Sequence, residues 1–186
     1  MTPERAPTAQ GGLPSWAVVT PQREAHVARV VALLERWADA LRLDAAERSR
    51  WLRAGWLHDA MRDAPAEELA RWAPDANERR AFRHGPAAAA RAAADGESDA
   101  DVLSAVRWHT VGWAGWGDTG KALYAADFLE PGRGFDREER AVLADRFPAE
   151  REAVLAEVIR RRIVFHERKG RPPRPETLAF LEAVAG

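Results

Sequence analysis

The stretch GWLHDAMRD, residues 55–63, places two ionisable side chains inside an apolar segment. Leu57 and Met61 indicate that the segment is buried, yet His58 and Asp59 stand next to each other in its middle. Burying such groups costs free energy unless they are hydrogen-bonded, paired or bound to a metal ion. The pair therefore needs partners from elsewhere in the chain, and these partners constrain the fold.

The segments on the N-terminal side of this pair have helical periodicity. Apolar residues recur at spacings of three and four in residues 27–41, which is typical of a helix with one buried face. Asp44 and Glu47 form a capping-box pattern that starts a second helix, and this helix ends near His58. His26 lies on the inward side of the first helix. Both histidines are therefore expected near the ends of buried helices.

The remainder of the chain continues the helical pattern. A short helix is expected after Pro65, and Pro86 suits the first turn of the next helix, with His84 at or just before its start. Ser98 and Asp101 signal the start of a helix that ends at His109. Further helices are expected over residues 119–129, 136–146 and 149–168 and after Pro175.

The helical pattern and the composition together predict one all-α domain. No strand pattern or internal repeat is present, and residues 1–20, rich in Pro, Gly and Thr, are expected to form a flexible arm before a domain at residues 21–186. The chain has 186 residues, 46% hydrophobic and 31% charged, as is typical of a single globular domain.

Charge and cysteine content exclude several classes of function. With 28 basic and 29 acidic residues the formal net charge is −1, so no global positive field attracts nucleic acid or an anionic membrane surface. No stretch resembles a signal peptide or a membrane span, which predicts a cytoplasmic protein. The absence of cysteine excludes disulfides and thiolate metal sites, so metal ligands must be His, Asp or Glu.

Six ionisable residues fall at predicted helix ends or on inward faces. Asp127 is typical of them, because its segment LYAADFLE has no polar stripe that explains a carboxylate. Nitrogen and oxygen ligands of this kind suit Fe, Mn, Zn or Mg-like ions, which activate water for hydrolysis. Hydrogen-bonded core histidines remain the alternative at this point, and His166 is expected at the surface. The six residues are His26, His58, Asp59, His84, His109 and Asp127.

The order of these residues resembles the HD superfamily of metal-dependent phosphohydrolases, and the YqeK family within it. The closer resemblance rests on HGPAAAA after His84, AVRWHTVGWAG around His109 and KALYAADFLEPGRGFD over residues 121–136. It implies an all-helical bundle with one or two divalent ions between helix ends, most often Fe, with Mn, Zn or Mg as alternatives. It also implies symmetrical hydrolysis of diadenosine tetraphosphate to two ADP by metal-activated water.

The resemblance assigns roles by matching positions. His26, His58, Asp59 and Asp127 would be the primary metal ligands. His84 and His109 would complete a second metal site or hold phosphates, and together with Asp59 they would be the catalytic residues. The substrate would be bound by Arg62, Thr110, Gly112, Lys121 and Arg133.

Several alternatives stay open on the sequence alone. The substrate is either a dinucleoside polyphosphate or, for an HD nucleotidase or phosphodiesterase, a mononucleotide or cyclic nucleotide; a non-catalytic nucleotide sensor is a further alternative. Trp113 and Trp116 either stack on adenine or pack on the domain. Apolar residues at Val154, Val158 and Phe165 either form a homodimer contact or close the core, and the core is favoured.

Overall fold

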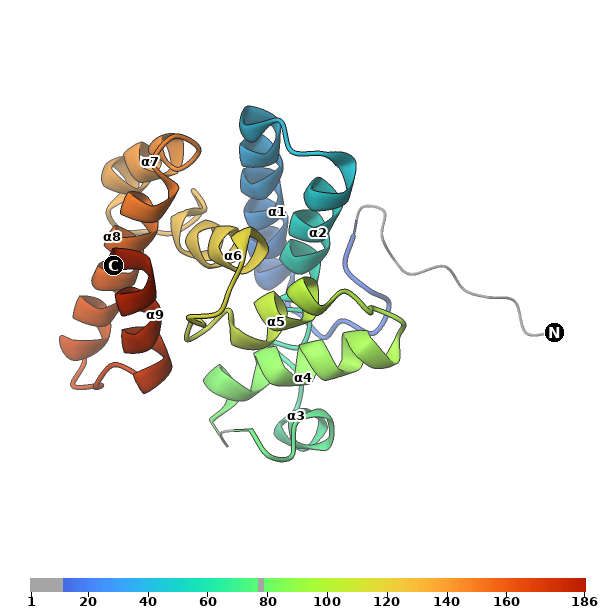
Figure 1. Ribbon diagram of the computed structural model, residues 1–186. Coiled ribbons are helices and arrows are strands. Elements are labelled where there is room, and N and C mark those ends of the chain that lie inside the picture. The colour runs from blue at the N-terminus through green and yellow to red at the C-terminus, as the bar shows by residue number, and fades with distance from the viewer. Residues whose placement is uncertain (1–11, 77–78) are drawn as a thin grey trace.

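The computed structural model describes residues 12–76 and 79–186, and helices account for its regular structure (Figure 1). No strand occurs in these two ranges, so the predicted all-α class is confirmed. The helices are α1 (Pro21–Leu41), α2 (Ala45–Leu57), α3 (Ala66–Trp72), α4 (Arg80–Ala94), α5 (Ala100–Trp108), α6 (Asp118–Leu129), α7 (Arg137–Arg146), α8 (Arg151–Glu167) and α9 (Pro175–Ala185).

Helices α1 and α2 form an antiparallel hairpin that brings the start of α1 beside the end of α2 (Figure 1). Thr20 caps α1, and Asp44 caps α2 by accepting hydrogen bonds from two backbone N–H groups. Gly55 allows the close approach of the two helices, because a Cβ atom there would lie 2.9 Å from side-chain atoms of Val31 and Leu34. The hairpin therefore places its two histidines at one end.

Helix α6 lies at the centre of the molecule and packs against α1, α2, α5, α7 and α8. Its interior position explains its composition, because Leu123, Tyr124 and Leu129 are all buried in one hydrophobic core cluster. That cluster extends from Val30 in α1 to Val184 in α9. Asp127, on the same helix, is therefore buried among protein groups.

Helix α4 begins earlier than the sequence predicts. It starts at Arg80, so Pro86 lies inside the helix and His84 lies in its second turn, and the expected start at Pro86 was wrong. Close packing on α5 explains the extension: a Cβ atom at Gly85 would lie 2.9 Å from the carbonyl oxygen of Arg107. Tertiary contact outweighs the local tendency of proline to begin a helix.

The cap of α5 also differs from the prediction. Asp99 is the N-cap, and its carboxylate accepts hydrogen bonds from the N–H groups of Asp101 and Val102. The expected signal from Ser98 and Asp101 was therefore displaced by one residue. The predicted end of the helix is confirmed, because His109 is its C-cap.

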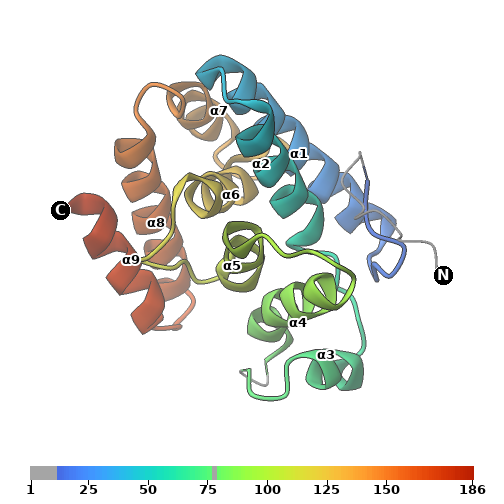
Figure 2. The same ribbon diagram turned by 45° about the vertical axis from the view of Figure 1, so that its right-hand side comes forward.

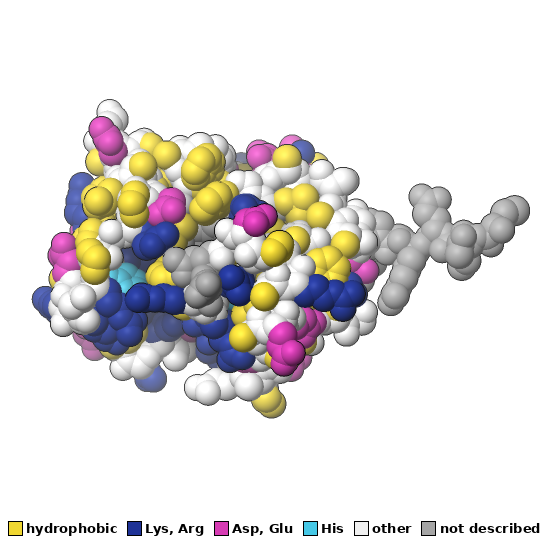
Figure 3. Space-filling view, turned by 90° about the horizontal axis from the view of Figure 1, so that it is seen from below, with side chains coloured by type: hydrophobic (Ala, Val, Ile, Leu, Met, Phe, Trp, Pro, Cys, Tyr) yellow, Lys and Arg dark blue, Asp and Glu magenta, His cyan; other side chains and the backbone are white. Residues whose placement is uncertain are grey.

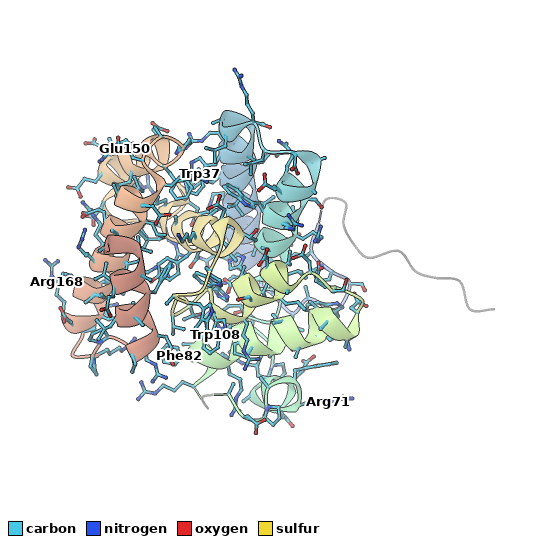
Figure 4. The ribbon with its side chains drawn as sticks, in the orientation of Figure 1. Trp37, Arg71, Phe82, Trp108, Glu150 and Arg168 are labelled. Carbon is cyan, nitrogen blue, oxygen red and sulfur yellow. The ribbon has the colours of Figure 1, made fainter. Side chains whose placement is uncertain are left out.

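Helices α7, α8 and α9 form the side of the molecule that lies across α6 from α3 and α4, and α8 and α9 lie side by side (Figure 2). Trp37 of α1 projects toward this side (Figure 4), where its indole N–H donates to the carbonyl of Ala144 at 2.8 Å and its ring stacks on Phe147. Val154 and Val158 are buried in the core, as favoured by the sequence, whereas Phe165, for which the core was also favoured, is exposed.

The described part of the expected arm packs on the helices. The backbone of Val18 pairs with Ala60 and Asp63, and the ring of Trp16 packs against the core cluster. Residues 1–11 of the expected arm lie outside the described residues. Among the described helices, none is both long enough and apolar enough to cross a membrane.

Candidate metal centre

Two histidines meet at the end of the α1–α2 hairpin. The Nε2 atom of His26 lies 3.1 Å from Oδ1 of Asp127, while its Nδ1 atom lies 3.0 Å from Oε1 of Glu130. At the C-cap of α2, His58 Nδ1 lies 2.7 Å from the carbonyl oxygen of Gly55. The Nε2 atom of His58 is buried, and no described residue forms a hydrogen bond with it.

Two more histidines come from α4 and the end of α5. Their Nδ1 atoms face helix carbonyl oxygens, His84 toward Arg80 at 3.1 Å and His109 toward Val106 at 2.8 Å. Their Nε2 atoms are only 2.9 Å apart. Because each carbonyl accepts a hydrogen bond from Nδ1–H, each Nε2 presents a lone pair. Two lone pairs at this distance repel unless a proton or cation lies between them.

Asp59 lies between the two pairs of histidines. Its Oδ2 atom is 3.8 Å from Nε2 of His26 and 3.7 Å from Nε2 of His58, whereas Oδ1 is 3.0 Å from Nε2 of His84 and 3.5 Å from that of His109. The five buried residues thus form two triads that share one carboxylate. The ligand atoms of each triad lie within 4.8 Å of one another, close enough to hold a metal ion.

Protonation equilibria fit a cation at this position. Burial lowers the pKa of His58 to about 4 and also lowers that of His84, so both imidazoles are neutral at pH 7. Burial alone would raise the pKa of Asp59, but the adjacent histidines hold it well below its usual range. Neutral imidazoles that converge on an ionised carboxylate fit a divalent metal ion.

His26 is oriented from behind by a second carboxylate. Burial lowers the pKa of His26, but Asp127 and Glu130 outweigh burial and raise it. The carboxylate of Glu130 that contacts His26 also accepts hydrogen bonds from Arg29 and from the N–H of Gly132. Although burial raises the pKa of Glu130, its hydrogen bonds with His26, Arg29 and Gly132 lower it to about 2. A carboxylate behind a histidine fixes the ring and makes it a stronger metal ligand.

Asp127 is held by two arginines. The guanidinium of Arg162 donates to Oδ2 at 2.5 Å and that of Arg133 donates to Oδ1 at 2.8 Å. Burial raises the pKa of Asp127, yet Arg162, His26 and Arg133 hold it well below its usual range. The carboxylate is therefore ionised and turned toward His26, as a metal ligand requires.

A cavity of about 1180 Å³ is lined by Asp59, His84, His109 and Asp127 of this cluster and by many arginines. In Figure 3 a histidine is visible in the hollow, and Lys and Arg side chains surround it. Asp59 and Asp127 are the acidic residues among the described ones that line it. A cavity of this charge attracts anions to the cluster. The arginines are Arg23, Arg62, Arg79, Arg133, Arg140, Arg162, Arg171 and Arg174.

The substrate-binding residues predicted by resemblance divide into two groups. Arg62, Thr110 and Arg133 line the cavity, and the hydroxyl of Thr110 lies 3.3 Å from Nε2 of His109. Gly112 and Lys121 do not line it. The space beside Gly112 is filled by the ring of Phe180, where a Cβ atom would lie 2.4 Å away.

Lys121 points away from the cavity because of its position on α6. It is six residues before Asp127, so helical geometry turns it about 120° from that carboxylate. Its Nζ atom donates to Glu152 at 2.9 Å. Lys121 and Gly112, which were expected to contact the substrate, therefore lie outside the lining of this cavity.

The aromatic residues also differ from one of the sequence interpretations. Trp116 is buried against Tyr124 and Phe180, and Trp113 stacks on Trp108, so packing on the domain is the alternative that the structure supports. His166, expected at the surface, is half-buried and lines the cavity.

Three contacts of the centre were missed by sequence reasoning. Arg162 holds Asp127 and Glu130 holds His26, and Arg23 donates to Oδ2 of Asp59 at 2.9 Å. Arginine is common throughout the chain, so no single arginine is conspicuous. Glu130 gave one signal, because it follows the apolar helix directly and precedes proline.

A sequence model of the HD domain matches residues 23–159, which is most of the chain. The chain belongs to the HD domain family. In this HD domain the adjacent His58 and Asp59 occupy the middle of the buried cluster. The family match and the buried cluster of His and Asp residues together indicate a divalent metal site in this HD domain.

Known proteins extend the comparison. The chain is 34% identical over 93 residues to the symmetrical bis(5'-nucleosyl)-tetraphosphatase of Bacillus subtilis, and the matched region spans 49% of this chain and 48% of that relative. The chain therefore spans about half the length of the curated relative. The HD domain also matches the crystal structure of a predicted HD superfamily hydrolase involved in NAD metabolism from Clostridium acetobutylicum. The two share a TM-score of 0.74 and 22% identity over 90% of each chain, which shows a common fold.

Proposed function

We propose that this HD domain hydrolyses dinucleoside polyphosphates symmetrically, with diadenosine tetraphosphate cleaved to two ADP molecules. The observation that carries the proposal is the pair of buried triads sharing Asp59 inside an arginine-lined cavity. The partial similarity to a symmetrical tetraphosphatase supports this choice of substrate.

The proposed metal ligands follow from the direction of each side chain. His26, His58 and Asp127 would hold one ion and His84 and His109 a second, with Asp59 between them. When bound, such ions lower the pKa of water and polarise phosphoryl oxygens. Fe is the first candidate because the resemblance to the YqeK family implies it, and Mn, Zn or Mg, which the same nitrogen and oxygen ligands suit, are alternatives.

The remaining residues would bind and orient the phosphate chain. Arg62 and Arg133 present guanidinium groups whose fork geometry matches phosphate oxygens. Thr110 would donate its hydroxyl hydrogen to a phosphate oxygen beside His109. Fixed positive groups that face developing negative charge stabilise the transition state more than the ground state.

The experiment is incubation of the purified protein with diadenosine tetraphosphate and Fe(II), Mn(II) or a chelator, followed by chromatography of the products. Metal-dependent release of ADP alone is the expected result. Release of ATP and AMP would show cleavage of a different bond. Absence of turnover with every metal would contradict the proposal and favour a mononucleotide or cyclic nucleotide substrate, or a nucleotide sensor.

The Asp59→Ala variant tests the role of the shared carboxylate. It should lose bound metal and turnover together, because both triads lose an oxygen ligand. Asp145→Ala is the matched control: this carboxylate is 70% exposed and pairs with Arg36 at the surface, so its removal should change neither property. Metal content is measured by elemental analysis, and full activity of Asp59→Ala would refute the role.

A further inference from the structure

The geometry points to a binding site for the base of the nucleotide, formed by Phe135 and Phe165 at the wall of the cavity. This inference rests on the proposed function and names the part of the substrate that the metal centre does not touch. It replaces the two loop tryptophans as the candidate stacking residues, since both of them lie outside the cavity.

The two rings stack on one another at the wall of the cavity. They are nearly parallel, with an interplanar angle of 8° and centroids 6.1 Å apart. Phe135 is 44% exposed and Phe165 is 42% exposed, although both line the cavity. Large apolar side chains that are exposed together in a concave site mark a place where a ligand buries them.

Phe135 is held from behind by a buried arginine. The guanidinium of Arg140 lies 4.6 Å from the ring centre of Phe135 and 4.5 Å from that of Phe128. Arg140 is 3% exposed, and none of its guanidinium nitrogens has a hydrogen-bond partner among the described residues. These cation–π contacts fix the ring without an acidic partner, so the positive charge stays available to an anionic ligand.

The position of the rings fits a nucleotide whose phosphates reach the metal centre. On α8, Phe165 follows Arg162 by three residues, so the ring lies about one helical turn from the arginine that holds Asp127. Phe135 follows Arg133, the other arginine on Asp127, by two residues. Phosphates at the metal centre would therefore leave the ribose and the base directed toward these rings.

A nucleobase is the occupant that fits both properties of the site. Planar bases stack on aromatic side chains, and the arginine-lined walls select a ligand that also carries phosphates. Lys169 places its Nζ atom 4.1 Å from the ring centre of Phe165, and this positive charge beside the ring favours a ligand that carries phosphates. A purely apolar ligand would leave these cations unpaired.

The test compares the binding of ADP and of inorganic pyrophosphate to the Mn(II)-loaded protein by isothermal titration calorimetry. In Phe135→Ala and Phe165→Ala the affinity for ADP should fall about ten-fold, because base stacking is lost. The affinity for pyrophosphate, which has no base, should not change. Phe165→Trp should retain the wild-type affinity for ADP, since a larger ring still stacks.

Trp113→Ala is the matched control, because Trp113 is 42% exposed but lies outside the cavity, and it should leave both affinities unchanged. Unchanged ADP affinity in both phenylalanine variants would overturn the inference, as would equal loss of ADP and pyrophosphate. The inference would also be overturned if the wild-type protein bound ADP no more tightly than pyrophosphate. Failure of the proposed function is seen separately, as absence of ADP among the products of diadenosine tetraphosphate.

Discussion

Arg162 lies in the interior of the protein, with its guanidinium 4.2 Å from the ring centre of Tyr124 and 2.5 Å from the carboxylate of Asp127. The arginine does not offer a metal ligand, yet it fixes the orientation and the charge of one. Removing one partner of a buried ion pair leaves the other partner charged and unpaired, which is strongly destabilising.

Arg162→Gln should therefore lower the metal affinity of the protein about 10- to 100-fold, as is typical for residues that orient ligands. Loss of the guanidinium also raises the pKa of Asp127, so a proton competes better with the metal ion. Metal affinity is measured by competition with a chelating dye.

The neighbouring Arg161 supplies the control. Its guanidinium pairs with Glu157 and Glu139 at the surface, so Arg161→Gln should leave the metal affinity unchanged and reduce the free energy of unfolding by less than about 1 kcal/mol. Equal effects of the two substitutions on metal affinity would show that Arg162 acts only through overall charge.

At the scale of elements, the caps of the helices fix where the site residues stand. Asp99 begins α5, which carries His109 at its other end, and it also binds Arg50 and Arg53 of α2. Asp99→Ala should lower the free energy of unfolding by about 1–2 kcal/mol, the usual cost of a lost N-cap. Ser98→Ala, at the position that the sequence favoured, should have almost no effect; urea denaturation measures both.

This contribution of Asp99 should depend on pH in a defined direction. Burial raises the pKa of Asp99, but Arg50 and the capped N–H groups lower it below the ordinary value of 3.8. A group whose pKa is lowered on folding stabilises the protein above its unfolded pKa and loses that contribution as the pH falls through its folded pKa. The stability difference between wild type and Asp99→Ala should therefore shrink below about pH 4.

The close packing of α1 on α2 depends on the absence of a side chain at Gly55. In Gly55→Ala the new methyl group would meet Val31 and Leu34, so the free energy of unfolding should fall by about 1–3 kcal/mol despite the better helix propensity of alanine. Metal affinity should fall as well, because the hairpin sets His26 against His58. Gly134→Ala, where no neighbour lies within 4 Å, is the control for stability, measured by urea denaturation.

At the scale of the whole molecule, the metal centre joins distant parts of the chain. Its six predicted ligands come from α1, the end of α2, α4, the end of α5 and α6. We propose that residues 21–186 unfold as one unit, so an ion bound at the centre stabilises all of it.

Addition of Mn(II) to metal-free protein should therefore raise the melting temperature, and the protein should still unfold in a single transition. An ion at one hundred times its dissociation constant adds about 2.7 kcal/mol to the free energy of unfolding. Calorimetry measures the transition, and Asp59→Ala, which lacks the shared ligand, should not respond. A transition that splits in two on metal addition would contradict the single unit.

The helices and the ligand residues were accessible to sequence reasoning. The apolar spacing in residues 27–41 and the cap at Asp44 predicted α1 and α2, because helix formation depends on neighbours within one or two turns. The six ionisable residues were found for a related reason: each is a polar group at a position where the local pattern predicts burial. The structure brings five of them into two triads that share Asp59, and it places Asp127 beside His26.

Residues whose role depends on partners far along the chain were decided only by the tertiary structure. Local pattern did not reveal that Gly85 packs on α5 or that α4 begins ahead of Pro86. It also did not reveal that Phe180 fills the space beside Gly112.

Arg162 and Phe165 likewise gained their places from the packing of α8 on α6. Periodicity tells which side of a helix is buried but not which side chain it meets there, since that contact is fixed by the packing of all the helices together. The sequence by itself thus determined the helices and the candidate metal ligands, and the tertiary structure decided which residues hold those side chains in place and which form the wall around them.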